Sequence, residues 1–134
     1  MELNYSDEQR REYLKMIDRN GQNWLEVFQG NAEFYSAAYW DLLTAIWRQN
    51  KPVRKTDALK MMVAIKSPQT AAKYVETALQ HKFLIEQDNP MDARSKLVAL
   101  SPDMRQRLDV FFDKAVAEVC NAYTIIASPI PEKI

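Results

Sequence analysis

The spacing of hydrophobic residues along the chain predicts a largely helical protein. Residues 36–49 carry an apolar stripe at positions i, i+3, i+4, i+7 and i+8, which is typical of a helix with one buried face. Residues 7–29 carry a second seam, with steps of three and four residues, formed by Leu14, Ile17, Gly21, Trp24 and Phe28. Because Asn20-Gly21 is also a turn signal, this segment is either one continuous helix or two helices broken there.

N-cap residues mark the starts of further helices. We predict these helices over residues 57–64, 68–81 and 102–127, with Thr56, Ser67 and Ser101 as their N-caps. Ser36 is a similar cap for the helix over residues 36–49. Pro129 and Pro131 are predicted to end the last helix. A very short turn joins the first two of these three helices, so they must cross at a steep angle, as in a helix-turn-helix.

Two strand-like segments, residues 84–88 and 96–100, flank a polar loop and predict a β-hairpin. The order of helices and hairpin is that of a winged helix-turn-helix. The predicted fold is therefore mainly α, with a small antiparallel β-hairpin and long N- and C-terminal helices. One compact domain would contain an N-terminal helical dimerisation arm (1–35), the winged helix-turn-helix (36–101) and a C-terminal dimerisation helix with a tail (102–134).

The composition limits the functions that the chain can have. Its 134 residues suit one domain, and its 18 basic and 18 acidic residues give a net charge of zero. Attraction of the whole molecule to nucleic acid or to an anionic membrane is therefore not expected, and any such binding needs a local patch. One Cys and one His offer no basis for a disulfide framework, a metal site or a Cys–His pair, so we predict no catalytic residues, no metal and no cofactor.

Membrane insertion is not expected from this sequence. No apolar run reaches the roughly 18 residues that a spanning helix needs. The N-terminus is polar and acidic and lacks the form of a signal peptide. We therefore expect a soluble cytoplasmic protein with no membrane partner.

Two short motifs of the chain resemble those of a known family. Asp92-Ala93-Arg94 is similar to the Asp-x-Arg motif of the wing, and Leu100-Ser101-Pro102 to the Leu-Thr-Pro that precedes the last helices, in the MarR family of transcriptional regulators. Residues 39–43 resemble the helix before the helix-turn-helix, so the similarity covers about residues 36–112. The resemblance implies a homodimer, formed by the terminal helices, that binds a palindromic operator in double-stranded DNA.

The sequence departs from this family at Phe83 and Met104, where Gly is common. Gly is favoured directly after a helix because the chain often turns there through a left-handed conformation. Phe83 therefore predicts either another kind of helix end or local strain. An alternative function stays open, namely a winged-helix protein-interaction module that has lost DNA binding. The zero net charge, Glu76 and Phe83 favour this alternative.

Positive charge is concentrated between residues 48 and 73. Seven basic residues and one acidic residue give this stretch a net charge of +6, as a phosphate-binding face requires. We expect the helix over 68–81 to enter the major groove and the wing to contact the adjacent minor groove. Gln69 could pair with adenine, and Lys73 could reach guanine or phosphate. The predicted DNA-binding residues are Arg54, Lys55, Lys66, Ser67, Gln69, Thr70, Lys73, Thr77, Arg94 and Lys96, with Asp92 holding Arg94 in the wing.

The long last helix has more apolar surface than one small domain can cover, so we expect a two-fold partner. The predicted dimerisation residues are Leu14, Ile17, Gly21, Trp24, Phe28, Phe112, Val116, Val119 and Tyr123. Aromatic residues also cluster on these helices. They form either ordinary core and dimer packing or, as the family resemblance implies, a site for a small aromatic effector. Cys120 lies among apolar neighbours and is expected to be a buried structural residue.

Overall fold

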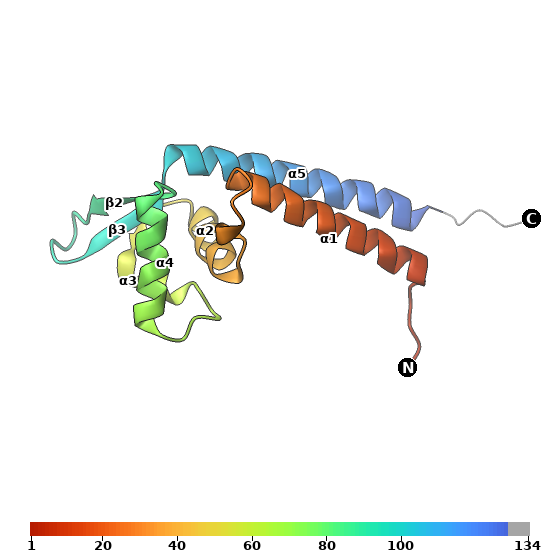
Figure 1. Ribbon diagram of the computed structural model, residues 1–134, viewed down its shortest axis with the longest axis horizontal. Coiled ribbons are helices and arrows are strands. Elements are labelled where there is room, and N and C mark those ends of the chain that lie inside the picture. The colour runs from red at the N-terminus through yellow and green to blue at the C-terminus, as the bar shows by residue number, and fades with distance from the viewer. Residues whose placement is uncertain (129–134) are drawn as a thin grey trace, which may run out of the picture.

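The computed structural model describes residues 1–128 and has two parts (Figure 1). Short helices and a small sheet form a body, and two long helices extend from it as an arm. The elements are α1 (Asp7–Val27), η1 (Ala32–Phe34), α2 (Ala37–Gln49), β1 (Val53–Arg54), α3 (Lys55–Lys60), α4 (Pro68–Gln80), β2 (Leu84–Asp88), β3 (Lys96–Leu100) and α5 (Pro102–Ala127). This order confirms the predicted winged helix-turn-helix. Pro129 and Pro131 lie outside the described residues.

Serine side chains cap α1, α2, α4 and α5. The hydroxyls of Ser36, Ser67 and Ser101 each accept a hydrogen bond from the backbone N–H three residues later, as predicted. Ser6 forms a capping box with Gln9 that the sequence analysis did not identify. Helix α1 continues without a break through Asn20-Gly21, so of the two alternatives for this segment the continuous helix is the one observed.

Helix α3 begins and ends earlier than predicted. It spans Lys55–Lys60 rather than residues 57–64, so the assignment of Thr56 as its N-cap was wrong. Its N-cap is Arg54, whose side chain makes no capping hydrogen bond. The cause is a pairing between distant residues, because Val53 and Arg54 form the strand β1 on the edge of β3. This strand leads directly into α3 and thereby sets where the helix starts.

The predicted hairpin is confirmed, and β1 extends it to an antiparallel sheet with the order β1-β3-β2. Strands β2 and β3 pair from Leu84 opposite Leu100 to Asp88 opposite Lys96. Val98 at the centre of the sheet is completely buried. The sheet therefore anchors the wing to the core and ties the start of α3 to the base of the wing.

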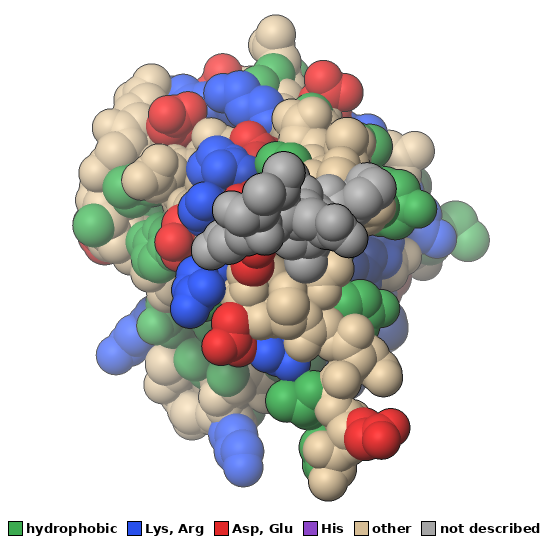
Figure 2. Space-filling model, turned by 90° about the vertical axis from the view of Figure 1, so that its right-hand side faces the viewer, with side chains coloured by type: hydrophobic (Ala, Val, Ile, Leu, Met, Phe, Trp, Pro, Cys, Tyr) green, Lys and Arg blue, Asp and Glu red, His purple; other side chains and the backbone are tan. Residues whose placement is uncertain are grey.

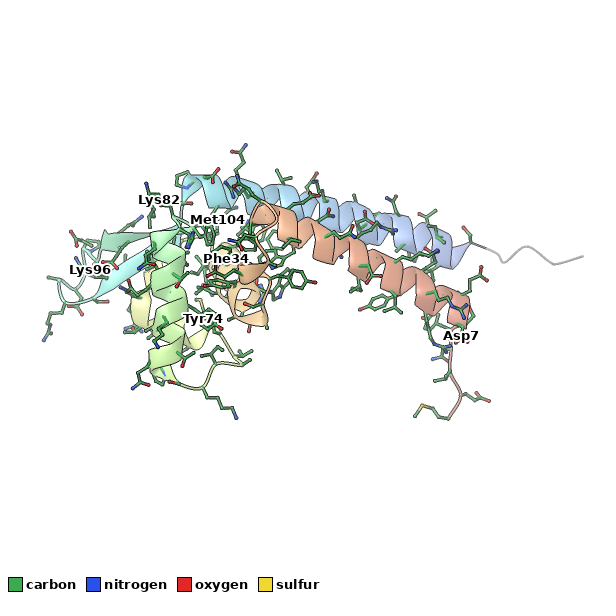
Figure 3. All side chains as sticks on the ribbon, in the orientation of Figure 1. Asp7, Phe34, Tyr74, Lys82, Lys96 and Met104 are labelled. Atoms are coloured by element: carbon green, nitrogen blue, oxygen red, sulfur yellow. The ribbon has the colours of Figure 1, made fainter. Side chains whose placement is uncertain are left out.

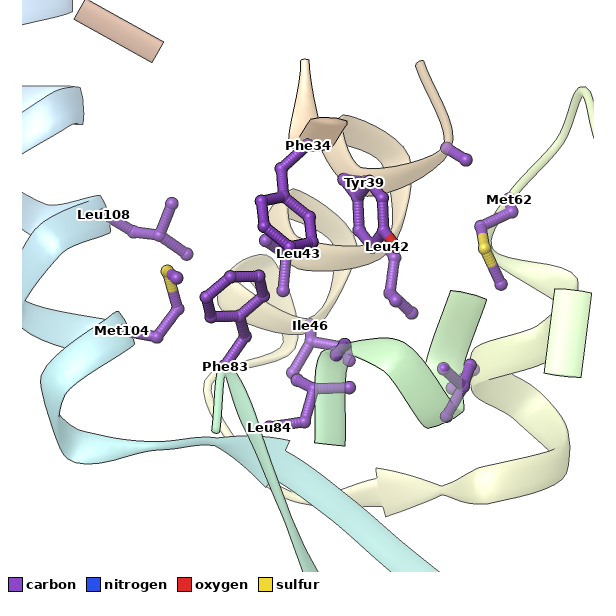
Figure 4. Close-up of a cluster of buried hydrophobic side chains, with 14 of the residues drawn as sticks. Phe34, Tyr39, Leu42, Leu43, Ile46, Met62, Phe83, Leu84, Met104 and Leu108 are labelled. Carbon is purple, nitrogen blue, oxygen red and sulfur yellow. The ribbon is translucent and has the colours of Figure 1, made fainter. Parts of the chain in front are cut away.

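The hydrophobic core lies where α2, α4, α5 and the base of the sheet meet (Figure 4). Leu42 and Leu43 of α2 and Leu108 of α5 have no exposed surface. Complete burial of a side chain of this size stabilises the fold by about 1.5–3 kcal/mol. The rings of Phe34 and Phe83 pack edge to face with 4.8 Å between their centroids. The core therefore fixes α4 and the wing relative to α2 and α5.

Helix α4 ends in a left-handed turn at Lys82 rather than at Phe83 (Figure 3). Lys82 has a φ angle of 60°. Its N–H donates to the carbonyl of Leu79 at 3.1 Å, and the N–H of Phe83 donates to the carbonyl of Ala78 at 2.9 Å. This pair of bonds is a Schellman motif. Phe83 thus enters the core without a positive φ angle. Of the two alternatives for this position, another kind of helix end is the one observed.

The arm is an antiparallel pair of α1 and α5, which lie side by side in Figure 1. The side chain of Gln9, near the start of α1, donates to the carbonyl of Ile126 near the end of α5 at 3.1 Å. At the opposite end of the pair, Arg107 donates to the carbonyl of Val27 at 2.9 Å. Polar contacts therefore fasten both ends of the helix pair.

The seam predicted along α1 is divided between two environments. Trp24 and Phe28 are 5% and 4% exposed and belong to the core of this chain. Leu14 and Ile17 are 57% and 41% exposed, so neither side chain is buried within this chain. The face of α1 that packs on α5 instead carries the buried Met16. The sequence analysis missed this face because many of its residues are polar.

Candidate nucleic-acid interface

Helix α4 presents a polar face to solvent and an apolar face to the core. Ala71, Val75 and Ala78 are at most 1% exposed. The predicted DNA-binding residues on the exposed side of α4 and at its cap are Ser67, Gln69, Thr70 and Lys73. The structure therefore leaves these side chains open to a partner.

Two of the predicted residues on α4 have partners within the protein. The Ser67 hydroxyl donates to Oε1 of Gln69 at 3.0 Å, which holds the Gln69 amide close to the start of the helix. Thr77 lies at the edge of the polar face and is half-buried. Its side chain hydrogen-bonds Tyr39 of α2, and this bond opposes the rise in the Tyr39 pKa that burial causes. The Thr77 hydroxyl thus helps to seat α4 on α2.

The wing loop between β2 and β3 is shaped by hydrogen bonds from side chains to the backbone. Asn89 Oδ1 accepts from the N–H of Met91, and Asp92 Oδ1 accepts from the N–H of Arg94, both at 3.0 Å. The Arg94 side chain is 96% exposed, and its Nε lies 3.8 Å from Asp92 Oδ1. Asp92 therefore holds the backbone of the loop more closely than it holds the Arg94 guanidinium.

Three further cations of the predicted set, Arg54, Lys55 and Lys96, form ion pairs with nearby carboxylates. Arg54 contacts both oxygens of Asp57, at 2.9 and 3.2 Å, and this hydrogen bonding raises the pKa of Arg54. Lys96 pairs with Asp88 across the hairpin (Figure 3 labels Lys96). That contact raises the pKa of Lys96 and lowers the pKa of Asp88.

Lys55 has two acidic partners. Its ammonium lies 2.8 Å from Glu76 Oε1 of α4 and 2.9 Å from Glu86 Oε2 of β2. Hydrogen bonds to Glu76 and then to Glu86 are the main causes of the raised pKa of Lys55. The lysine thus connects α3, α4 and β2.

Four carboxylates from outside residues 48–73, namely Glu76, Glu86, Asp88 and Asp92, lower the positive charge of the interface. We define the wing–helix face as the predicted cations together with the carboxylates paired to them. It contains six cations, namely Arg54, Lys55, Lys66, Lys73, Arg94 and Lys96, and five carboxylates, namely Asp57, Glu76, Glu86, Asp88 and Asp92. Its net charge is therefore +1. Within residues 1–128, Lys66 and Lys73 have no ion pair, so they are free to contact phosphate.

A groove runs between α3, α4 and the wing at the centre of this face. Its volume is about 470 Å³, and its lining includes Arg54, Lys55, Ala72, Arg94 and Lys96. Residues from positions 54 to 96 thus converge on one concave surface. The fold brings four of the six predicted cations, Arg54, Lys55, Arg94 and Lys96, to this groove, whereas Lys66 and Lys73 are not part of its lining.

The sequence analysis did not identify the carboxylates that pair with the predicted cations, apart from Asp92. It considered Glu76 only as a residue that favours the protein-interaction module. The pairing of Asp88 with Lys96 could have been found, because a hairpin with strands 84–88 and 96–100 places these two residues opposite each other. The contact between Lys55 and Glu86 had no such signal. It depends on how α3 packs against the sheet.

The arm exposes part of the apolar surface that we predicted to form a dimer. Val116, Val119 and Tyr123 of α5 are 63%, 52% and 71% exposed, and Phe112 is half-buried. Figure 2 looks onto the free end of the arm, where hydrophobic side chains lie among charged side chains of both signs. Cys120 is also exposed, so the expectation that it is buried within this chain was wrong. Helix α5 turns that position away from α1.

A cavity of about 580 Å³ lies where the arm meets the body. Its lining includes Asn20, Trp24, Tyr35, Trp40 and Phe112. The indole rings of Trp24 and Trp40 meet edge to face, with 5.0 Å between their centroids. The Oδ1 atom of Asn20 is buried and accepts no hydrogen bond from the described residues. Aromatic side chains from both the arm and the body thus form the walls of the cavity.

Residues 1–128 contain no cluster of His, Cys, Asp and Glu side chains suited to holding a metal ion. In the same range, no helix combines the length and apolar character needed to cross a membrane.

No protein-family model matches the sequence, and no curated protein matches it significantly. Solved structures do match the fold. A MepR mutant from S. aureus bound to an oligodeoxyribonucleotide has a TM-score of 0.60 and 15% sequence identity, covering 90% of this chain and 84% of that chain. A MepR mutant from a multidrug resistant S. aureus clinical isolate has a TM-score of 0.60 and 14% identity, covering 92% and 84%. The chain has the MarR-type winged-helix fold.

Bordetella bronchiseptica BpsR also has this fold, with a TM-score of 0.51 and 20% identity over 92% of this chain and 84% of that chain. Its structure concerns the regulation of its DNA binding by 6-hydroxynicotinic acid. In the MarR-type fold of the present chain, α4 occupies the place of the second helix of the helix-turn-helix, and β2 and β3 form the wing.

Proposed function

We propose that this protein is a DNA-binding transcriptional regulator of the MarR type. The observation that carries the proposal is the groove between α3, α4 and the wing, which is lined by the cations Arg54, Lys55, Arg94 and Lys96. The MarR-type fold adds support, since a MepR mutant with this fold is bound to an oligodeoxyribonucleotide.

DNA docking follows from the spacing of grooves and phosphates. We place α4 in a major groove of the DNA and the wing on the adjacent minor groove. The DNA backbone between these two grooves then passes over the protein surface between α3, α4 and the wing. Lys66 and Lys73 would contact phosphates, and Arg94 would reach the minor groove or its edge. The Gln69 amide would contact a base near the start of the recognition helix.

A homodimer would supply the second recognition helix. The exposed Val116, Val119 and Tyr123 of α5, together with Leu14 and Ile17 of α1, would form the dimer interface. A two-fold partner covers such a surface with an identical one, and the operator would then be palindromic.

The cavity between arm and body would hold a small aromatic effector. Aromatic ligands pack well against the indole edges and faces of Trp24 and Trp40. BpsR, whose DNA binding is regulated by 6-hydroxynicotinic acid, shares the fold.

Selection of bound sequences from random DNA, at two salt concentrations, tests the function. We expect an enriched palindrome whose half-sites lie about 10 base pairs apart or a multiple of that spacing. The second candidate is a protein-interaction module, which is favoured by the net charge of only +1 on the wing–helix face. Weak, salt-sensitive binding without sequence preference would support that candidate and overturn the regulator.

A further inference from the structure

Lys55 stands where a DNA phosphate would pass, yet two carboxylates hold it. It lines the groove between α3, α4 and the wing. Its ammonium contacts Glu76 at 2.8 Å and Glu86 at 2.9 Å, and its side chain is 31% exposed. An ammonium has three N–H donors, so at most one remains for a phosphate oxygen.

Lys55 and its two carboxylate partners, taken together, do not attract phosphate. One ammonium between two carboxylates has a net charge of −1. Glu76 lies on the exposed face of the recognition helix, and Glu86 lies on the strand that carries the wing. A face built only for strong DNA binding would not place two carboxylates at this point.

Resting on the proposed function, we propose that Glu76 and Glu86 form a carboxylate clamp that withholds Lys55 from DNA phosphate. The clamp limits the strength of DNA binding and fixes the recognition helix relative to the wing. Glu76 then acts through Lys55 rather than by accepting a hydrogen bond from a base. In this arrangement Lys55 positions the two DNA-contacting elements and is not one of the phosphate-binding residues.

The test measures binding of one operator-length duplex across a series of salt concentrations. The variants are Glu76→Gln/Glu86→Gln, the same pair combined with Lys55→Met, and the wild type. Removal of both carboxylates should free Lys55 for phosphate. We expect up to about fivefold tighter binding at low salt and a salt slope that is steeper by about one unit. Addition of Lys55→Met should abolish the steeper slope.

Two controls separate the clamp from other effects of charge. Glu33→Gln changes the net charge at an exposed position outside the interface, and it should leave the salt slope unchanged. An NMR titration without DNA should show that the Lys55 pKa falls toward its ordinary value in the Glu76→Gln/Glu86→Gln variant.

The outcomes distinguish this inference from the proposed function. If the wild type binds DNA and the double variant binds with the same affinity and salt slope, the clamp is wrong and the regulator stands. If neither protein binds DNA at any salt concentration, both proposals are wrong. A Lys55→Met addition that leaves the steeper slope in place would also overturn the clamp.

Discussion

Gly21 of α1 lies directly against the hydroxyl of Tyr35, because a Cβ atom added at Gly21 would come within 2.8 Å of Tyr35 Oη. The two residues also share the lining of the cavity between arm and body. The Tyr35 side chain is 55% exposed, so its ring has room to move outward. The contact therefore does not by itself require glycine inside the helix.

We predict that Gly21→Ala stabilises the protein. Glycine inside a helix costs about 0.5–1 kcal/mol relative to alanine, and the displaced Tyr35 ring should give back little of that gain. Urea unfolding should show a free energy of unfolding higher by roughly that amount. The same change in a Tyr35→Ala background serves as the control. A loss of stability in the wild-type background alone would mean that the Tyr35 ring cannot move.

Lys82→Gly should also raise the free energy of unfolding. Lys82 is in the left-handed region, which costs an L-residue about 1–2 kcal/mol. Glycine removes that cost but loses more entropy on folding, so we expect a net gain of about 0.5–1 kcal/mol. Lys82→Ala keeps the Cβ atom and removes the charge. Equal gains for both variants would show that charge, not backbone conformation, determines the effect.

Arg94→Ala should weaken DNA binding and leave thermal stability almost unchanged. A lost phosphate contact lowers the salt slope by about one unit, whereas a contact in a narrow minor groove would appear as reduced preference for A·T-rich flanks. The side chain is 96% exposed and pairs only loosely with Asp92, so the melting temperature should hardly move. Arg11→Ala on the arm removes the same charge as a control. A variant that binds like the wild type would exclude the wing from DNA binding.

Val119→Lys should convert the proposed homodimer to a monomer. An ammonium at the centre of an apolar two-fold interface would face its own copy and lose hydration. Val110 is 51% exposed on the opposite side of α5, so Val110→Lys is the matched control and should remain a dimer. Light scattering at micromolar concentration measures both. A monomeric wild type would refute the proposed interface.

The pair of Asp88 and Lys96 predicts an acid-sensitive contact in the wing. The lowered pKa of Asp88 means that its contribution to stability is present above about pH 4 and is lost as the pH falls through the folded-state pKa. An NMR titration should place the Asp88 pKa below its ordinary value, and Lys96→Met should restore it.

Local signals explain why so much of the fold could be predicted. The serine caps of α2, α4 and α5 act within three residues, and the hairpin strands end where the polar loop begins. The start of α3 could not be predicted in this way. It is set by pairing of Val53 with Val98, which lies far along the chain.

The same distinction applies to the interface. The exposed side of α4 follows from helical periodicity, so Gln69 and Lys73 were correctly placed on the surface. The effective charge of Lys55 depends on Glu86, which is 31 residues away. A count of charges along the sequence cannot show which cations already have partners.

The junction at Ser101 has a mechanical consequence. This single residue separates β3 from α5, and it is 6% exposed. Its N–H donates to the carbonyl of Phe83 at 3.0 Å, and its hydroxyl caps α5 at Met104. The connection between the wing and the arm is thus short and held by hydrogen bonds at both sides of Ser101. A rotation of α5 would therefore also rotate β3 and the wing, so a displacement of the free end of the arm would change the position of the wing.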